Sequence, residues 1–349
     1  MTTYPLHRLV FVYRPGCAKV LENLLRFATA KIALVLLQEC TISPTEKAHY
    51  LAIDSDLRFT TDAEEAMAHP GDAILWAREV FETETDFHCW RDLMTLAITH
   101  RRNIYNLARL NLIATDPELS ELAMRNAVHC WEASAASCAI EKPPTYGQII
   151  PKTPAAKVIL AVGTERRCGK FTTTQILKER LQRQGLNTAE LATEPYGLLT
   201  GADAVIIPQM LTMWEAAPTV HRIVRDLEAA LHPDIILVSS QSGLRSRGLD
   251  AFGRCGGIIA HTMALGSLPD ACILCSPLSS IGSIKAEKEL LEALLTTTVL
   301  GISIKEWNHP LATDSFAAVQ EAFEIPVFDP LHTPERLDEV IQSLLALST

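Results

Sequence analysis

The sequence predicts an α/β protein with two doubly wound parallel-sheet domains, and two observations carry this prediction. Short apolar runs rich in β-branched residues alternate with segments of helical periodicity along the 349 residues. This alternation stops once, between about residues 134 and 154, in a stretch that contains several prolines. We therefore expect one α/β domain over residues 1–140, a linker over about 134–154, and a second α/β domain over residues 155–349.

In the first half, strands and helices alternate as a parallel sheet requires. The predicted strands cover residues 9–13, 32–37, 73–76 and 104–107, with a further short strand beginning at 52–53. A helix is expected through Val20, Leu21 and Leu24, another after an N-cap at Asp62, and another over residues 86–101. The run Thr115-Asp116-Pro117-Glu118 has a cap and a proline where a helix begins.

The second half repeats the alternation. Strands are predicted over residues 158–162, 188–192, 234–238, 271–275 and 299–303, and the stretch 325–328 precedes the last helix. Helices are predicted from about residue 170 to 185 and over residues 221–231, 285–295 and 334–347. Residues 204–207 are interpreted as the start of the helix that carries Met210 to Trp214, and residues 239–257 as a long loop.

Composition limits the class of protein. Hydrophobic residues make up 48% of the chain and charged residues 21%, which allows a sizeable core. The net charge of −10 argues against general nucleic-acid binding, and no apolar run is long enough to cross a membrane. The amino terminus lacks a signal-peptide pattern, and nine cysteines scattered through apolar segments fit a reducing compartment. We expect a cytoplasmic protein with a small-molecule substrate and no nucleic-acid or membrane partner; a homo-oligomer is left open.

The stretch from Gly163 to Thr173 predicts a phosphate-binding loop. It follows a buried strand, is bounded by Gly163 and Gly169, and leads into a helix that starts at Lys170. Glycines let the backbone approach an anion, the free N–H groups of a helix start bind it, and a lysine adds charge. The alternative is an ordinary strand-to-helix turn with a lysine at the helix start.

The loop departs from the usual nucleotide-binding pattern in two ways. Five residues rather than four separate the two glycines, and Phe171 follows Lys170 where a Ser or Thr would contact magnesium. Thr172 and Thr173 come next, so a hydroxyl is near that position. No acidic residue ends the next core strand, because Ser239 and Ser240 stand there. Magnesium is therefore doubtful.

Three loops are expected to meet at the carboxyl edge of the second sheet, over residues 163–173, 192–203 and 239–257. They carry the cations Arg166, Arg167, Lys170, Arg245, Arg247 and Arg254. Arginine suits phosphate oxygens, so a polyphosphate bound without metal, such as that of coenzyme A, becomes plausible. The alternative is that these arginines are solvated loop charges.

Other chemistry-bearing residues give weaker signals. The acids within reach are Glu165, Glu194, Asp203 and Asp250, and His261 follows an apolar run. We take Glu194, Asp203 and His261 as candidates for a catalytic base. Cys272 and Cys275 have metal-like spacing but lie in a predicted strand, which favours core packing. Cys168 is interpreted as structural.

On these residues, the second half resembles the P-loop domain of domain-of-unknown-function family 1611, and the loop Gly163–Lys170 resembles that of dethiobiotin synthetase more distantly. The family-like segments are residues 162–173, 192–193, 197–199 and 266–271. Residues 115–119 are similar to the family's Rossmann-like amino-terminal domain. The resemblance implies a Rossmann-like domain followed by a P-loop NTPase-like domain. Because the family includes a D-glutamate N-acetyltransferase, it also implies acetyl transfer from acetyl-CoA to the amino group of a D-amino acid or related amine.

Two positions depart from the family. Ser239-Ser240-Gln241-Ser242 stands where the family has an acidic Glu-Gly-Gln-Gly segment, and Leu265 stands where it has a histidine. The favoured hypothesis is an acyl-CoA-dependent N-acyltransferase that holds phosphate with Gly163, Thr164, Arg166, Arg167, Gly169, Lys170, Thr172, Thr173 and Arg245. The alternatives are an ATP-dependent kinase or carboxylate-activating ligase, with Thr172 or Thr173 reaching magnesium, and a non-catalytic nucleotide-binding protein.

Overall fold

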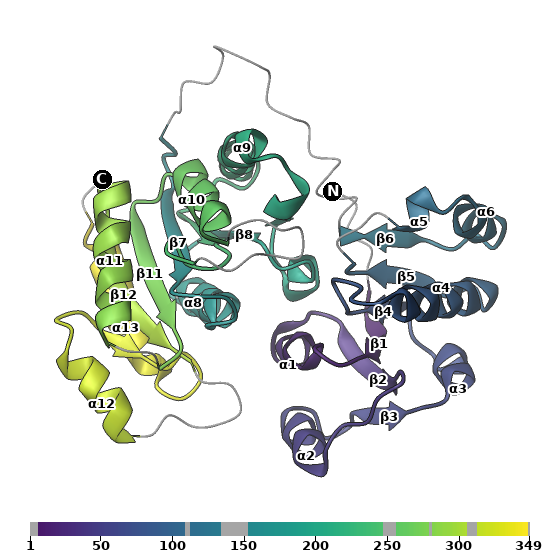
Figure 1. Cartoon of the computed structure of the whole chain (residues 1–349). Helices are drawn as coiled ribbons and strands as arrows, with labels where there is room; N and C mark the ends of the chain where they lie inside the picture. Colours follow the sequence, from purple (N-terminus) through teal and green to yellow (C-terminus); the bar gives the residue numbers. More distant parts are fainter. Residues whose placement is uncertain are drawn as a thin grey trace. The chain divides into compact units, whose positions relative to one another are not determined.

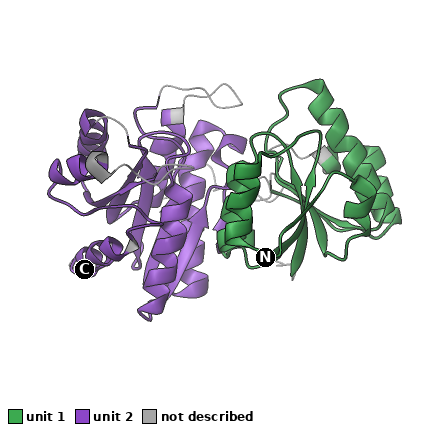
Figure 2. Cartoon of the chain, turned by 90° about the horizontal axis from the view of Figure 1, so that it is seen from below, with its two compact units in different colours: residues 1–139, 195–201 green, residues 140–194, 202–349 purple. Residues whose placement is uncertain are grey.

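The computed structural model describes residues 6–108, 112–133, 153–246, 256–278, 281–305 and 313–347. The chain forms two compact units, shown in different colours in Figure 2. Unit 1 comprises residues 1–139 together with 195–201, and unit 2 comprises residues 140–194 and 202–349. Most of the expected linker, residues 134–152, lies outside the described residues.

Unit 1 is built on a six-stranded parallel sheet in the order β3-β2-β1-β4-β5-β6 (Figure 1). Its strands are β1 (Arg8–Tyr13), β2 (Lys31–Leu37), β3 (Arg58–Thr60), β4 (Ala73–Trp76), β5 (Asn103–Asn106) and β6 (Cys130–Glu132). This is the strand order of a Rossmann fold, so the expected Rossmann-like class is confirmed. The short strands β3 and β6 were not predicted, because three residues are too few to show a period.

The helices of unit 1 begin where the sequence supplies caps. They are α1 (Ala18–Phe27), α2 (Pro44–Ile53), α3 (Ala63–Ala68), α4 (Glu84–Thr99), α5 (Leu112–Thr115) and α6 (Pro117–Arg125). The side chains of Asp62 and Asp116 accept hydrogen bonds from the first turns of α3 and α6, as predicted. The strand expected at residues 52–53 is wrong: these residues end α2, which starts at a capping box formed by Ser43 and Glu46.

At the carboxyl end of β1, a buried arginine is held by its own unit. The guanidinium of Arg14 lies 2.7 Å from the Asp86 carboxylate and 3.1 Å from that of Glu39. Arg78 contacts the other oxygen of Asp86 at 3.3 Å. Burial would raise the pKa of Asp86, but the backbone N–H of Glu82 and the two guanidiniums outweigh it and lower that pKa. These charges are therefore compensated within unit 1.

The segment 195–201 lies between two parts of unit 2 in the sequence, but it packs in unit 1. The amide nitrogen of Asn23 donates to the hydroxyl of Tyr196 at 2.8 Å, and the backbone N–H of Thr29 donates to the carbonyl of Leu199 at 2.8 Å. Tyr196 is 3% exposed. Unit 1 is thus completed by seven residues that follow β8 of unit 2 in the chain.

Unit 2 is built on a seven-stranded parallel sheet in the order β13-β12-β11-β7-β10-β8-β9. Figure 1 labels β7, β8, β11 and β12 of this sheet. Its strands are β7 (Lys157–Gly163), β8 (Thr188–Ala192), β9 (Ala204–Val205), β10 (Ile235–Ser239), β11 (Ala271–Ser276), β12 (Thr298–Ile304) and β13 (Val327–Phe328). The sheet confirms the expected second doubly wound α/β domain.

The helices of unit 2 lie on both faces of this sheet, with α9 packed against α10 and α13 against α8. They are α8 (Lys170–Arg183), α9 (Met213–Leu231), α10 (Gly256–Ser267), α11 (Ile281–Leu295), α12 (Thr313–Glu321) and α13 (Leu337–Leu345). Residues 204–207 do not begin a helix, which corrects that prediction: Ala204 and Val205 pair with β8, and α9 begins only after the Thr212 cap. The end of the expected loop 239–257 is also different, because α10 starts at Gly256.

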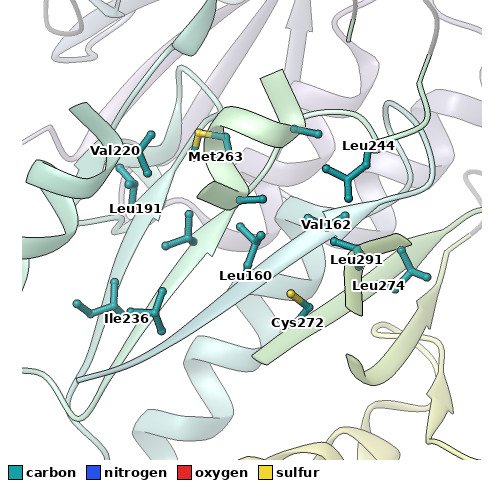
Figure 3. Packing of buried hydrophobic residues seen from close by; sticks show 14 of the residues in the cluster. Leu160, Val162, Leu191, Val220, Ile236, Leu244, Met263, Cys272, Leu274 and Leu291 are labelled. Carbon is teal, nitrogen blue, oxygen red and sulfur yellow. The ribbon is translucent and has the colours of Figure 1, made fainter. Parts of the chain in front are cut away.

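One hydrophobic cluster of unit 2 lies between its sheet and the helices on one face. Leu160 and Val162 of β7 pack with Ile236, Met263 and Leu274, all fully buried (Figure 3). Cys272 belongs to the same cluster, in keeping with the core role expected from its place in a strand. Burial raises the pKa of Cys272 to about 12, so its thiol stays protonated at neutral pH.

The family-like stretch 266–271 holds the sheet and its helices together. A side chain at Gly266 would begin 2.5 Å from the carbonyl oxygen of Ala217, so glycine allows α10 to approach α9. The Asp270 carboxylate accepts a hydrogen bond of 2.7 Å from the backbone of Val158 at the start of β7. No helix among the described residues is long and apolar enough to span a membrane.

Candidate functional site

The candidate site lies at the carboxyl ends of β7 and β10, which are neighbours in the sheet of unit 2. After β7 the chain passes through α8 to β8, which lies beyond β10 in the sheet. After β10 it passes through α10 to β11, which lies beyond β7 in the opposite direction. The direction of winding therefore reverses between β7 and β10. Open α/β sheets bind their ligands at such a switch point.

The loop after β7 closes tightly on itself, and its glycines make this possible. A Cβ atom at Gly163 would lie 2.4 Å from the Cys168 sulfur and 2.8 Å from the carbonyl oxygen of Glu165, so the loop requires glycine there. Gly169 has φ +93° and is the N-cap of α8, which begins at Lys170. The predicted arrangement of strand, loop and helix is present.

Lys170 places its charge inside this loop. The side chain is 8% exposed, and its ammonium donates to the carbonyl oxygen of Glu165 at 2.9 Å and lies 3.5 Å from the Cys168 sulfur. Neither of these partners is a carboxylate. The first N–H groups of α8, which carry the positive end of the helix dipole, start at the same residue. The loop thus concentrates positive potential where an anion would sit.

The hydroxyls around the loop are already engaged. Thr164 exchanges a hydrogen bond of 3.0 Å with Ser276, the residue that ends β11. Thr173 donates to the carbonyl of Gly169 at 2.9 Å and lies 2.7 Å from the Ser303 hydroxyl. The Thr172 hydroxyl accepts a hydrogen bond of 2.9 Å from the ammonium of Lys305. A metal ion at Thr172 or Thr173 would have to compete with these contacts.

Lys305 is a residue of the site that the sequence analysis missed. It follows β12 directly, and its side chain is 2% exposed. Its aliphatic stem packs on Gly169, where an added Cβ would lie 2.9 Å from the lysine Cβ. The rule that the carboxyl ends of parallel strands share one edge would have identified it, had it been applied to the strand over residues 299–303.

The three expected loops are brought together only in part. The loop after β10 lies against the phosphate loop, since Gly163 donates to the carbonyl of Ser242 and a Cβ at Gly243 would lie 2.4 Å from the Gly163 carbonyl. At the end of β8, the backbone N–H of Thr193 donates to the Ser239 hydroxyl at 3.2 Å. The next residues, 195–201, belong to unit 1.

Three of the predicted arginines are described, and all three lie on the surface of these loops. Arg166, Arg167 and Arg245 are exposed, and Arg167 has a positive φ of 60°. Exposed guanidiniums interact more weakly with a bound anion than buried ones, because water and salt screen them. Arg247, Asp250 and Arg254 lie outside the described residues.

The three candidate bases occupy different surroundings. Asp203 lies 3.4 Å from the Lys178 ammonium and accepts a 2.8 Å hydrogen bond from the backbone of Glu190, so it is part of an ion network between α8 and β8. Glu194 is half-buried at the end of the unit 2 segment that follows β8. The Nδ1 atom of His261 lies 2.7 Å from the carbonyl of Gly257, one turn earlier in α10.

A buried glutamate supports the loop after β10, and the sequence analysis missed it as well. The carboxylate of Glu287 in α11 accepts hydrogen bonds from the backbone N–H groups of Leu244 and Arg245. Burial raises the pKa of Glu287, although these bonds and the charges of Arg245 and His261 act in the opposite direction. Glu287 therefore holds in place the loop after β10, which lies against Gly163. Glu287 also lies near His261.

Within the described ranges, no group of three or more His, Cys, Asp or Glu side chains could hold a metal ion. At the two places where P-loop proteins supply magnesium ligands, this chain has Phe171, which is 5% exposed, and Ser239, whose hydroxyl accepts the Thr193 bond. Cys275 is fully buried beside Thr173, and burial raises its pKa to about 12. It remains a thiol at neutral pH and is a poor metal ligand in this state.

Comparison with protein families matches residues 145–338 to the model described as the P-loop domain of a domain of unknown function, DUF1611. A crystal structure of a DUF1611 family protein from Anabaena variabilis superposes with a TM-score of 0.76 at 17% identity and covers 96% of this chain and 99% of its own. That likeness shows the two-unit fold. No curated protein matches the chain.

Other solved structures match less of the chain. A nucleotide-binding protein from Archaeoglobus fulgidus in complex with ADP has a TM-score of 0.34 and 15% identity, over 53% of this chain and 85% of its own. A cobyrinic acid a,c-diamide synthase from Mycobacterium smegmatis with ADP and magnesium has a TM-score of 0.36 and 13% identity, over 54% and 94%. At these scores neither structure bears on what this chain binds.

Proposed function

The chain belongs to the DUF1611 family, and from that membership and the geometry of the loop we propose that unit 2 binds a polyphosphate group of a small molecule, that of a nucleotide or of coenzyme A. The observation that carries the proposal is the buried Lys170 ammonium, held by the Glu165 carbonyl and the Cys168 sulfur at the first turn of α8. A phosphate there receives charge-assisted hydrogen bonds and the free N–H groups of the helix.

Within this proposal, the reaction we favour is acyl transfer from acetyl-CoA to the amino group of an amino acid, as the family resemblance implies. The amine nitrogen attacks the thioester carbonyl, the new C–N bond forms, and the C–S bond breaks. The amine proton passes to a base, and coenzyme A leaves as the free thiol.

Among the candidate bases, the contacts favour His261. If its Nδ1 carries the proton that binds the Gly257 carbonyl, its Nε2 has a lone pair to accept a proton in the neutral ring. Asp203 is less suited, because its carboxylate is used by Lys178 and by the backbone of Glu190. Glu194 is the second candidate.

A kinase or ligase is the alternative, and a non-catalytic nucleotide-binding protein is a third reading. The ATP-dependent alternative needs magnesium ligands, for which Thr172 and Thr173 would have to leave Lys305 and Ser303. Cytoplasmic location and a small-molecule substrate remain part of the proposal.

The proposal is tested by calorimetric titration of the whole chain with acetyl-CoA, ATP and ATP with magnesium. Lys170→Ala should weaken binding roughly ten- to a hundredfold, since a hydrogen bond to a charged group contributes about 1.5–3 kcal/mol. Lys288→Ala is the matched control, because Lys288 lies in α11 and pairs with Glu292 of the same helix.

Unchanged affinity of Lys170→Ala for every polyphosphate would refute the phosphate site. If acetyl-CoA binds, release of its thiol is then followed with a panel of D- and L-amino acids. Tight binding of ATP with magnesium, together with no affinity for acetyl-CoA, would favour the kinase or ligase.

A further inference from the structure

Two lysines lie at the start of α8, one of them its first residue and the other reaching it from another strand of the sheet. Lys170 follows the loop after β7, whereas Lys305 follows β12, two strands away from β7 in the sheet order. Both side chains are more than nine-tenths buried, at 8% and 2% exposure. Both lysines add positive charge at the positive end of one helix, where an anion would interact favourably with them.

The side chain of Lys305 is held in a defined position. Its stem lies on the Cα of Gly169, its backbone N–H donates to the Ser276 carbonyl at 3.1 Å, and its ammonium donates to Thr172 at 2.9 Å. Gly169 is the N-cap of α8 and Thr172 is in its first turn. The ammonium therefore lies against the turn whose N–H groups would bind a phosphate.

The ammonium of Lys305 contacts a hydroxyl in the first turn of α8, as a metal ion does in other P-loop proteins. A hydroxyl in the first turn of the P-loop helix normally gives a lone pair to magnesium, and the metal offsets the phosphate charge. Here the residue after Lys170 is Phe171, and the nearest following hydroxyl, that of Thr172, gives a lone pair to an ammonium. The positive charge is supplied by the protein.

We propose that Lys305 is a second phosphate-binding lysine of the loop, whose ammonium supplies at Thr172 the charge that a divalent metal supplies in other P-loop proteins. The ligand it suits is a diphosphate or triphosphate group bound without metal. This proposal rests on the proposed function, namely that unit 2 binds polyphosphate. Lys305 acts as a positioning charge, together with Thr172, and not as a catalytic residue.

The test is calorimetric titration of the full chain with ADP, ATP and coenzyme A, in EDTA and again in magnesium chloride. Lys305→Gln retains a hydrogen-bond donor for Thr172 but removes the charge, and Lys305→Met removes both. Lys170→Met is the reference for loss of the site, and Lys288→Met is the charge-matched control in α11. Thermal unfolding of each variant shows whether it is folded.

We expect Lys305→Gln and Lys305→Met to bind roughly ten- to a hundredfold more weakly than the parent in EDTA. Magnesium should restore part of that loss, because a metal on the phosphates compensates for the missing charge. Lys288→Met should bind like the parent in both buffers.

Three results would overturn the proposal while leaving the phosphate site in place. These are parent-like binding by Lys305→Gln, equal weakening with and without magnesium, and a parent protein that binds only with magnesium. If Lys305→Met does not fold, the Gln variant decides alone. If the parent binds no polyphosphate under either condition, the proposed function itself fails.

Discussion

Two constraints require glycine at position 169: its backbone conformation and its contact with Lys305. A substitution by alanine distinguishes it from Gly185, where only the first constraint applies. Its φ of +93° is costly for any residue with a Cβ atom, and such an atom would also lie 2.9 Å from the Cβ of Lys305. Gly185 has a similar φ of +84°, but a Cβ atom there would meet nothing within 4 Å.

Gly169→Ala should therefore lower the free energy of unfolding by about 2–5 kcal/mol, the sum of left-handed strain and overpacking. Gly185→Ala should cost only about 1–2 kcal/mol, because strain alone applies. Denaturant unfolding of both variants measures the difference. Equal losses would mean that the stem of Lys305 does not constrain Gly169.

At the residue scale, the sequence predicted the groups that lie close together along the chain. Gly163, Gly169 and Lys170 fall within one motif, so their spacing alone reveals the loop. Lys305 follows a distant strand and Glu287 lies in a distant helix, and the topology of the sheet, not a motif, brings them to the same site. Such residues cannot be found from spacing before the topology is known.

At the scale of elements, α11 anchors the loop that follows β10. Glu287 is 2% exposed and holds the backbone of Leu244 and Arg245. Its raised pKa means that the folded chain binds a proton at this carboxyl more tightly than the unfolded chain does. The stability that this site contributes is therefore greatest in acid and falls as pH rises from the unfolded value, about 4.3, through the folded one.

Glu287→Gln removes this proton linkage while keeping a carbonyl oxygen for the loop. The free energy of unfolding of the variant, minus that of the parent, should increase as pH rises from about 4 to 7. Denaturant melts at a series of pH values measure this difference. Glu289→Gln, at an exposed position of the same helix, is the control. A difference that stays constant or shrinks with rising pH would contradict the linkage.

Helices and strands could be predicted where a long apolar pattern runs along the sequence. They could not be predicted where a helix cap or a pairing strand determines the structure. The strands of both sheet centres and helices α4, α9 and α11 follow from their patterns. Helix α2 was missed because Ser43 and Glu46, not an apolar stripe, define its start. Ala204 and Val205 became a strand because β8 offers a partner, a tertiary effect that their sequence does not contain.

At the scale of the molecule, unit 1 is not one continuous piece of chain. The backbone of Thr29 depends on Leu199 for its hydrogen bond, whereas the backbone of Lys31 is bound to His7, at 2.9 Å. A fragment of residues 1–140 contains the second bond but not the first. The domain boundary expected near residue 140 would therefore yield an incomplete unit 1.

In such a fragment, the amide of Thr29 should exchange with solvent at least tenfold faster than in the whole chain, because it lacks the Leu199 acceptor. The amide of Lys31 should change much less. Hydrogen exchange followed by NMR compares the two sites in both proteins. Equal protection of Thr29 in the fragment and the whole chain would show that residues 195–201 do not complete the unit.

The segment 195–201 also ties the order of folding to the order of synthesis. When a ribosome has made residue 139, the partners of Asn23 and Thr29 do not yet exist. Roughly sixty more residues must be added, which at about 5–20 residues per second takes on the order of 3–12 s. During that delay the growing chain carries an amino-terminal unit that is still unfinished, and chaperones can bind it. Its last piece arrives only after β7, α8 and β8 have been translated.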